Sequence, residues 1–110
     1  MVLIMTTTWI PQGKEVEIGK KYFDVMREYP GESFEKSVLP LGVVSNKNGT
    51  KVISIVKVKE GHYEEAINRV TKRLLTLSEV GGINYQIETL LSGQEAISLI
   101  GLQIPHQVPM

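Results

Sequence analysis

The stretch that decides the fold is Leu41–Val58, which reads LGVVSNKNGTKVISIVKV. Two β-rich runs flank Asn48-Gly49, a pair typical of a tight hairpin because both residues tolerate positive φ. Neighbouring residues of a strand point to opposite faces. In the second run both alternating sets are largely apolar: Val52, Ser54, Val56 and Val58 on one face, Ile53 and Ile55 on the other. The sequence therefore predicts a strand covered on both sides.

The chain before the hairpin supplies a strand, a helix and a second strand. Val2–Trp9 is predicted to be another strand with two apolar faces, Val2 and Ile4 opposite Leu3 and Met5. A helix is expected from Lys14 to about Tyr29, with two adjoining apolar stripes and so an unusually wide apolar face. The stripes are Val16, Gly19, Phe23 and Met26, and Ile18, Tyr22, Val25 and Tyr29. Residues 34–45 form a strand containing Pro40, which cannot donate to a neighbour and so belongs at a sheet edge.

After the hairpin, helical periodicity over residues 62–79 predicts a second long helix, and alternation over residues 83–91 predicts the last strand. Ser92 and Glu95 match a capping box, so a short third helix should begin there and stop at Gly101. The order βαββαβ predicts an α+β, ferredoxin-like fold. Its four-stranded antiparallel sheet has the spatial order fourth, first, third, second, with both long helices on one face. We expect one domain over residues 1–101 and a tail over 102–110.

Two helices cover one face of such a sheet and leave the other open. Here the open face is apolar whichever set of side chains it carries, and exposed apolar patches mark interaction surfaces. Two-fold pairing with a second copy is the simplest way to cover it. We therefore expect a homodimer that forms through the open face.

With these features the chain resembles the dimeric α+β barrel superfamily, including antibiotic-biosynthesis-monooxygenase-like and stress-responsive barrel proteins. The resemblance covers about residues 1–101. It rests on Val2–Trp9, the helix opening after Pro11-Gln12-Gly13, the Asn48-Gly49 hairpin and the helix opening after Glu60-Gly61. It implies a dimer whose two sheets close into a barrel, with a pocket between sheet and helices in each subunit. It supplies no activity.

Composition narrows the function further. Twelve basic residues balance twelve acidic ones, so the charge gives no reason to expect a nucleic-acid partner. The absence of cysteine excludes thiolate metal sites and disulfides, and it fits a cytoplasmic location. No run approaches the roughly 20 apolar residues of a membrane helix. We expect no membrane association, no metal and no cofactor.

The catalytic candidates are His62 and Glu88. Each also has a more ordinary interpretation. His62 begins a helix, where an exposed histidine is merely tolerated. Glu88 alternates with Asn84 and Gln86 on one face of the last strand, and would be a base only if that face were the buried barrel interior. The other histidine, His106, lies in the proline-bounded tail and is expected to be solvated.

The ligand-binding candidates are three aromatic residues, Trp9, Tyr22 and Tyr85, which could line a sheet–helix pocket or simply fill the core. Whether the protein is an enzyme stays open at this stage. The sequence favours a dimeric protein that binds a small hydrophobic ligand. The alternatives are a cofactor-independent monooxygenase or isomerase of the barrel type, and a structural assembly protein.

Overall fold

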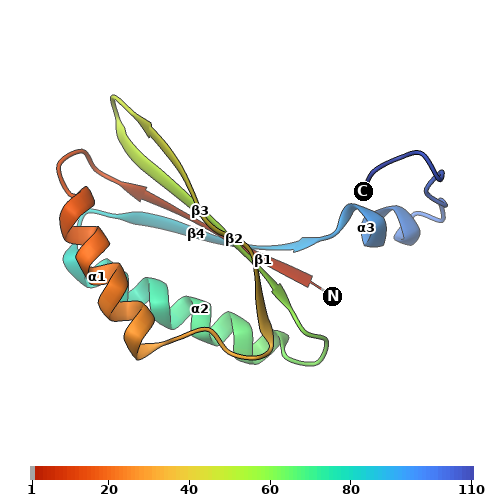
Figure 1. Ribbon diagram of the computed structural model, residues 1–110, viewed down its shortest axis with the longest axis horizontal. Helices are drawn as coiled ribbons and strands as arrows, with labels where there is room; N and C mark the ends of the chain where they lie inside the picture. Colours follow the sequence, from red (N-terminus) through yellow and green to blue (C-terminus); the bar gives the residue numbers. More distant parts are fainter. Residues whose placement is uncertain (1) are drawn as a thin grey trace.

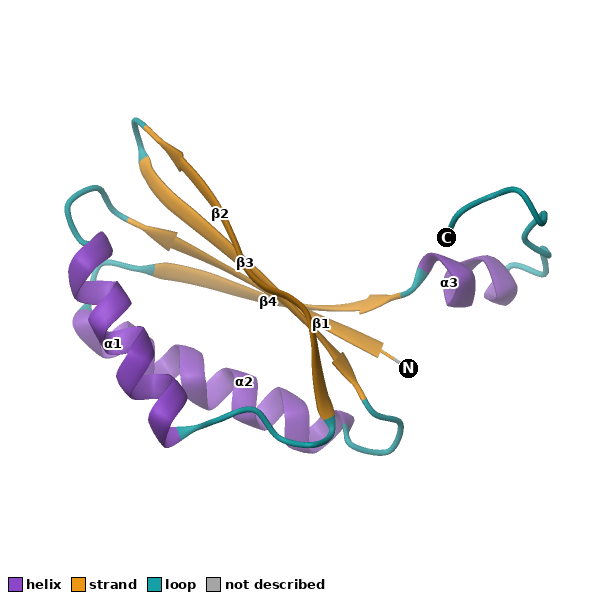
Figure 2. Ribbon diagram, in the orientation of Figure 1, coloured by secondary structure: helices purple, strands orange, loops and turns teal. Residues whose placement is uncertain are grey.

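The computed structural model describes residues 2–110, and its elements follow the predicted order (Figure 1). They are β1 (Val2–Ile10), α1 (Glu15–Glu28), β2 (Glu35–Asn46), β3 (Gly49–Val58), α2 (Tyr63–Leu77), the 3-10 turn η1 (Ser78–Val80), β4 (Asn84–Leu91) and α3 (Gly93–Leu99). The ferredoxin-like fold is confirmed, with four antiparallel strands in the order β2-β3-β1-β4. Both long helices lie on the same side of the sheet (Figure 2).

The outer strand β2 contains Pro40, as predicted. Its pairing with β3 shifts register twice, between Ser37 and Leu39 and between Leu39 and Gly42. Pro40 lies within the second irregularity. A residue without an N–H costs no ladder hydrogen bond at such a bulge on an edge strand.

The structure decides which strand faces meet the helices. Ile4 and Val58 are almost fully buried beneath α1 and α2, in a core that the buried side chains of both helices complete. The core residues on the helices are Ile18 and Val25 of α1, and Ala66, Val70, Leu74 and Leu77 of α2. The alternate residues therefore point to the open face, where Met5 pairs with Ile55. Both central strands carry apolar side chains on this open side.

The hairpin differs in detail from the prediction. Asn46 pairs with Gly49, so the turn residues are Lys47 and Asn48, and among residues 2–110 positive φ is confined to glycines. The expected positive φ at Asn48 is therefore wrong; Gly49 alone takes it, at +123°. The Asn46 side chain accepts a hydrogen bond from the Asn48 N–H at 2.8 Å, which stabilises the turn without a left-handed asparagine.

Ser92 caps α3 as predicted, accepting a hydrogen bond from the Glu95 N–H at 3.1 Å. Beyond β4, however, α3 and the residues after it project away from the sheet and from both long helices (Figure 1). The radius of gyration is 16.0 Å, whereas a compact domain of this length has about 13 Å. The division into a domain of residues 1–101 and a tail stays a prediction.

Candidate functional site: an apolar cleft between α1 and the β2–β3 hairpin

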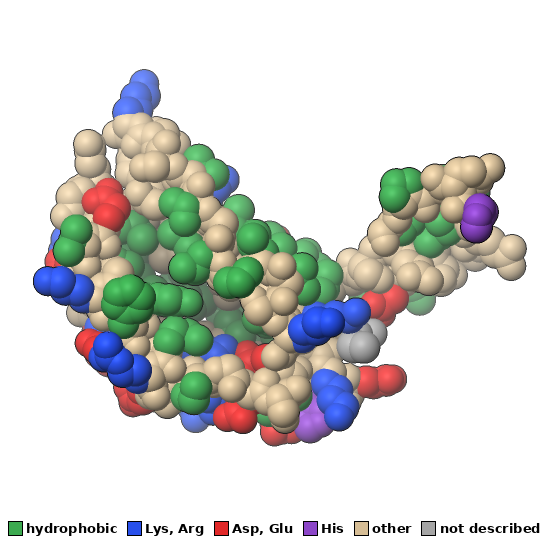
Figure 3. All heavy atoms as spheres, viewed as in Figure 1, with side chains coloured by type: hydrophobic (Ala, Val, Ile, Leu, Met, Phe, Trp, Pro, Cys, Tyr) green, Lys and Arg blue, Asp and Glu red, His purple; other side chains and the backbone are tan. Residues whose placement is uncertain are grey.

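A cleft of about 620 Å³ opens on the helix side of the sheet, between α1 and strands β2 and β3 (Figure 3). α1 provides Ile18, Gly19, Tyr22, Phe23, Val25 and Met26 to its wall. β2 provides Pro40, Leu41 and Val43, and β3 provides Val52 and Val56. The cleft is open and overwhelmingly apolar.

The wide apolar face of α1 explains why the cleft exists. Ile18 and Val25 enter the core, while Gly19, Phe23 and Met26 of the adjoining stripe border the cleft. Gly19 has no side chain, and a Cβ added there would meet nothing within 4 Å. Phe23 on one rim and Val43 on the other are each 61% exposed. Exposed apolar side chains therefore lie on both rims of the cleft.

The floor of the cleft carries hydroxyl groups among its aliphatic side chains. Thr6 and Thr8 of β1 line it, and Thr6 lies directly across from Ser54 of β3. Thr50 and Ser37 add two more hydroxyls along the same surface. Hydroxyls donate or accept without carrying charge, so the floor can orient a neutral polar group on a bound molecule.

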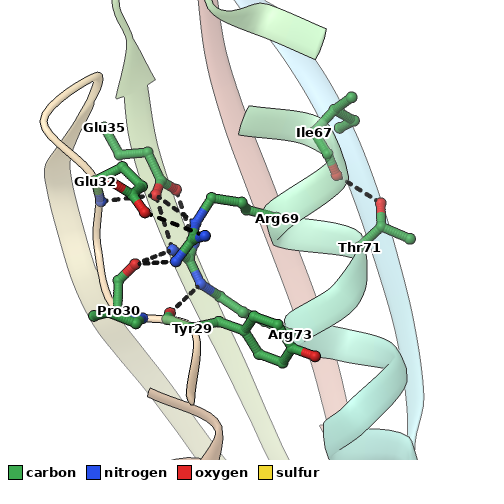
Figure 4. Close-up of polar contacts among 8 residues, drawn as sticks. All are labelled: Tyr29, Pro30, Glu32, Glu35, Ile67, Arg69, Thr71 and Arg73. Atoms are coloured by element: carbon green, nitrogen blue, oxygen red, sulfur yellow. Dashed lines mark hydrogen bonds and ion pairs between the residues drawn. The ribbon is translucent and has the colours of Figure 1, made fainter. Parts of the chain in front are cut away.

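One end of the cleft is closed by an ion pair between Glu35 and Arg73 (Figure 4). The Arg73 guanidinium donates to both Glu35 oxygens at 2.8 Å, and also to the carbonyl oxygens of Tyr29 and Pro30. Arg69, one helical turn earlier on α2, donates to the same Pro30 oxygen at 2.7 Å and approaches Glu32 at 3.2 Å. α2 thereby holds the loop between α1 and β2 in place.

This cluster also sets the charge at the closed end. Burial by itself raises the pKa of Glu35. The hydrogen bonds and charge of Arg73 outweigh burial, helped by the Glu32 N–H and by Arg69, so the pKa lies below its usual value. Glu35 is therefore ionised at neutral pH and cancels the charge of Arg73. The remaining acidic side chain on the lining is Glu15, at the start of α1.

The three aromatic candidates lie apart. Tyr22 lines the cleft. Tyr85 points to the helix side but packs against the core outside the cleft. Trp9 does not reach the helix side. By strand alternation it lies on the open face, where it borders a smaller hollow of about 270 Å³ beside the hairpin. A ligand-binding role for any of the three stays a prediction.

The catalytic candidates also lie outside the cleft. His62 precedes α2, stacks on Phe34 with ring centroids 5.0 Å apart, and lies 3.0 Å from Glu65 through Nδ1. It is half-buried rather than freely exposed. Glu88 is half-buried on the open face beside Met5, and its neighbours Asn84 and Gln86 are exposed. His106 is exposed in the tail.

The sequence predicted no functional role for three residues that line the cleft: Gly19, Glu35 and Arg73. In the sequence, Gly19 was only a member of an apolar stripe. The structure places it over the cleft, where its lack of a side chain leaves space. Glu35 and Arg73 are 38 positions apart, so no local pattern connects them. The wide apolar face of α1 was the one sequence signal that pointed to this cleft.

Among residues 2–110, no helix is long and apolar enough to cross a membrane. The same described residues contain no cluster of three or more histidine or acidic side chains that could hold a metal ion.

No protein-family model matches the chain, and no curated protein does. A solved structure of the de novo designed protein Foldit4 superposes with a TM-score of 0.61 at 9% identity, covering 83% of this chain and 97% of that one. That likeness shows the fold alone. A dimeric ferredoxin-like protein from an uncultured marine organism has a TM-score of 0.46 at 12% identity, covering 83% and 89%. A NIPSNAP domain protein from Burkholderia xenovorans has 0.43 at 15%, covering 84% and 97%. The last two likenesses are too loose to support an argument about function.

Proposed function

We propose that the protein is a dimeric binding protein for an uncharged, mostly apolar small molecule held in the cleft between α1 and the β2–β3 hairpin. The observation that carries the proposal is the cleft itself. Its volume of about 620 Å³ lies within the roughly 300–1,000 Å³ typical of ligand pockets. Its apolar walls and sparse hydroxyls are the usual lining of such a pocket.

The chemistry of the lining supports a neutral ligand. At the closed end Glu35 and Arg73 compensate each other, so neither attracts an ion strongly. An anion would gain little electrostatic stabilisation at this end, and it would lose its hydration on entering an apolar cleft. A molecule with an apolar body and one or two hydroxyl or carbonyl groups matches both the apolar walls and the hydroxyl groups of the floor, which include Thr6 and Ser54.

The dimer part of the proposal rests on the open face of the sheet. Four half-buried apolar side chains lie there on the two central strands: Leu3, Met5, Ile53 and Ile55. Trp9, at the end of β1, is 39% exposed on the same side. A contiguous apolar surface of this kind favours association with another sheet.

The ligand proposal can be tested with the neutral dye N-phenyl-1-naphthylamine, whose fluorescence rises in apolar surroundings. We expect saturable binding to the wild-type protein. Gly19→Leu should abolish it, because the new side chain would project into space that the ligand needs. Lys20→Leu is the matched control. It adds the same side chain at the next position of α1, on an exposed residue outside the cleft, and should leave binding intact.

Both variants should keep the wild-type circular dichroism spectrum. Saturable dye binding that survives in Gly19→Leu would contradict the proposed site. So would the absence of saturable binding to the wild-type protein.

A further inference from the structure

The C-terminal arm, residues 93–110, carries a surface to which neither the fold nor the cleft assigns a role. It leaves the sheet at the end of β4 and lies away from both long helices (Figures 1 and 2). The tail turns back toward α3, so that the C-terminus lies beside this helix (Figure 1). A Cβ added at Gly93 would lie 2.7 Å from the terminal methyl carbon of Met110.

The arm has the composition of a contact surface rather than of a solvated tail. The last charged residue of the chain, leaving histidine aside, is Glu95, and residues 96–110 contain no Lys, Arg, Asp or Glu. Five large apolar side chains of the arm are exposed: Leu99, Ile100, Leu102, Val108 and Met110. Exposing this much apolar surface without neighbouring charges is unfavourable in water.

We propose that the arm docks on a second copy of the chain and completes a single interface with the open face of that copy's sheet. This inference rests on the dimer part of the proposed function and names the segment that makes the dimer stable. It also accounts for the extended shape, 47 × 32 × 18 Å, because an arm that packs on a second copy must extend away from its own sheet and helices.

The apolar area favours one shared interface over two separate ones. Five side chains of this size bring about 400 Å², roughly half of the ~800 Å² that each partner contributes to a stable interface. The apolar residues of the open face, four half-buried side chains and Trp9, add a smaller area. Neither surface is large enough alone, and a shared interface brings the contact closer to the usual size. The formal net charge of +0 adds no repulsion between copies.

The test measures dimer dissociation by sedimentation velocity over about 1–100 µM protein. The arm variant is Leu99→Glu with Ile100→Glu; these side chains are 75% and 71% exposed, so few contacts within the chain are lost. The control is Val16→Glu, on a side chain of α1 that is 72% exposed and lies outside both the arm and the open face. We expect the arm variant to raise the dimer dissociation constant by at least about tenfold and the control to leave it unchanged.

A second measurement locates the arm. The chain has no cysteine, so Leu99→Cys offers one site for a benzophenone photocrosslinker. Irradiation should join the arm to strands β1, β3 or β4 of the other copy. Crosslinks confined to the same chain, or to the partner's arm alone, would overturn the proposal.

Dissociation of the arm variant at the same concentration as Val16→Glu would also overturn it, since the sheet would then dimerise without the arm. A wild-type monomer throughout the concentration range would overturn the arm and the dimer together. Dye binding to the cleft, measured separately on the same variants, reports on the ligand proposal independently.

Discussion

Arg73 and Glu35 form a bidentate ion pair, with Nη1 2.8 Å from one carboxylate oxygen and Nη2 2.8 Å from the other. Their side chains are only 14% and 3% exposed. The pair joins α2 to the first residue of β2, and the remaining Arg73 donors hold the carbonyls of Tyr29 and Pro30. One guanidinium thus fixes the loop that closes the cleft.

Removing one partner of this ion pair should lower the free energy of unfolding. In Glu35→Gln the neutral amide leaves the charge of Arg73 uncompensated in a buried setting, and we expect a loss of roughly 3 kcal/mol in the free energy of unfolding. Asp24→Asn is the control, because Asp24 forms an exposed pair with Arg27 and its loss should cost less than about 0.5 kcal/mol. Urea denaturation at pH 7 measures both. Equal losses in the two variants would contradict the structural role of Glu35.

The same pair should make stability depend on acid pH. The pKa of Glu35 is lower in the folded protein than the ordinary value of 4.5, so below that value the unfolded chain binds more protons. The stabilisation by Glu35 is complete above pH 4.5 and is lost as pH falls through the lowered pKa. The difference in unfolding free energy between wild type and Glu35→Gln should therefore shrink as pH falls from 5 to 3. A difference that stays constant would contradict the lowered pKa.

Gly49 should tolerate substitution less well than Gly13. Its φ is +123°, and a Cβ there would lie 2.3 Å from the Ile10 carbonyl oxygen. Gly13 has φ +93° with nothing within 4 Å, so Gly13→Ala shows the cost of the backbone conformation alone, about 1–2 kcal/mol. Gly49→Ala should cost clearly more, and Gly49→Val more again. Thermal unfolding would refute this prediction if Gly49→Ala and Gly13→Ala melted alike.

Lysine at two nearby positions of β3 should separate folding from assembly. Val56 packs against the core on the helix side, so Val56→Lys buries a charge and should unfold the protein or cost several kcal/mol. Ile53 points to the open face, so Ile53→Lys should keep the fold and produce a monomer. Circular dichroism and light scattering distinguish the two outcomes. A dimeric Ile53→Lys protein would contradict the proposed interface.

Much of the fold could be read from local pattern. Alternation marked β3 and β1 as strands with two apolar faces, helical spacing marked α1 and α2, and Pro40 marked the edge strand. These signals work because a strand or helix repeats its side-chain directions every few residues, so burial leaves a period in the sequence. The cap at Ser92 was equally local.

The hairpin shows where local signals stop. Asn48-Gly49 correctly indicated a tight turn, but the turn residues are Lys47 and Asn48, and Asn48 does not take positive φ. The side-chain oxygen of Asn46 accepts a hydrogen bond from the Asn48 N–H. The carbonyl of Ile10, which belongs to another strand, leaves no room for a side chain at Gly49. A dipeptide cannot specify a contact made across the sheet.

The sequence by itself determined the order of elements, the strand arrangement and the presence of apolar side chains on both faces of the central strands. Only the tertiary structure decided that Ile4 faces the helices while Met5 faces outward, and that Trp9 lies outside the cleft that Tyr22 lines. It alone brought Glu35 to Arg73 and left the arm beyond β4 without a covering element. The physical reason is that periodicity records whether a side chain is buried but not against what. The partner of each face is chosen when distant segments pack together, where residues far apart in the chain meet and share burial and charge.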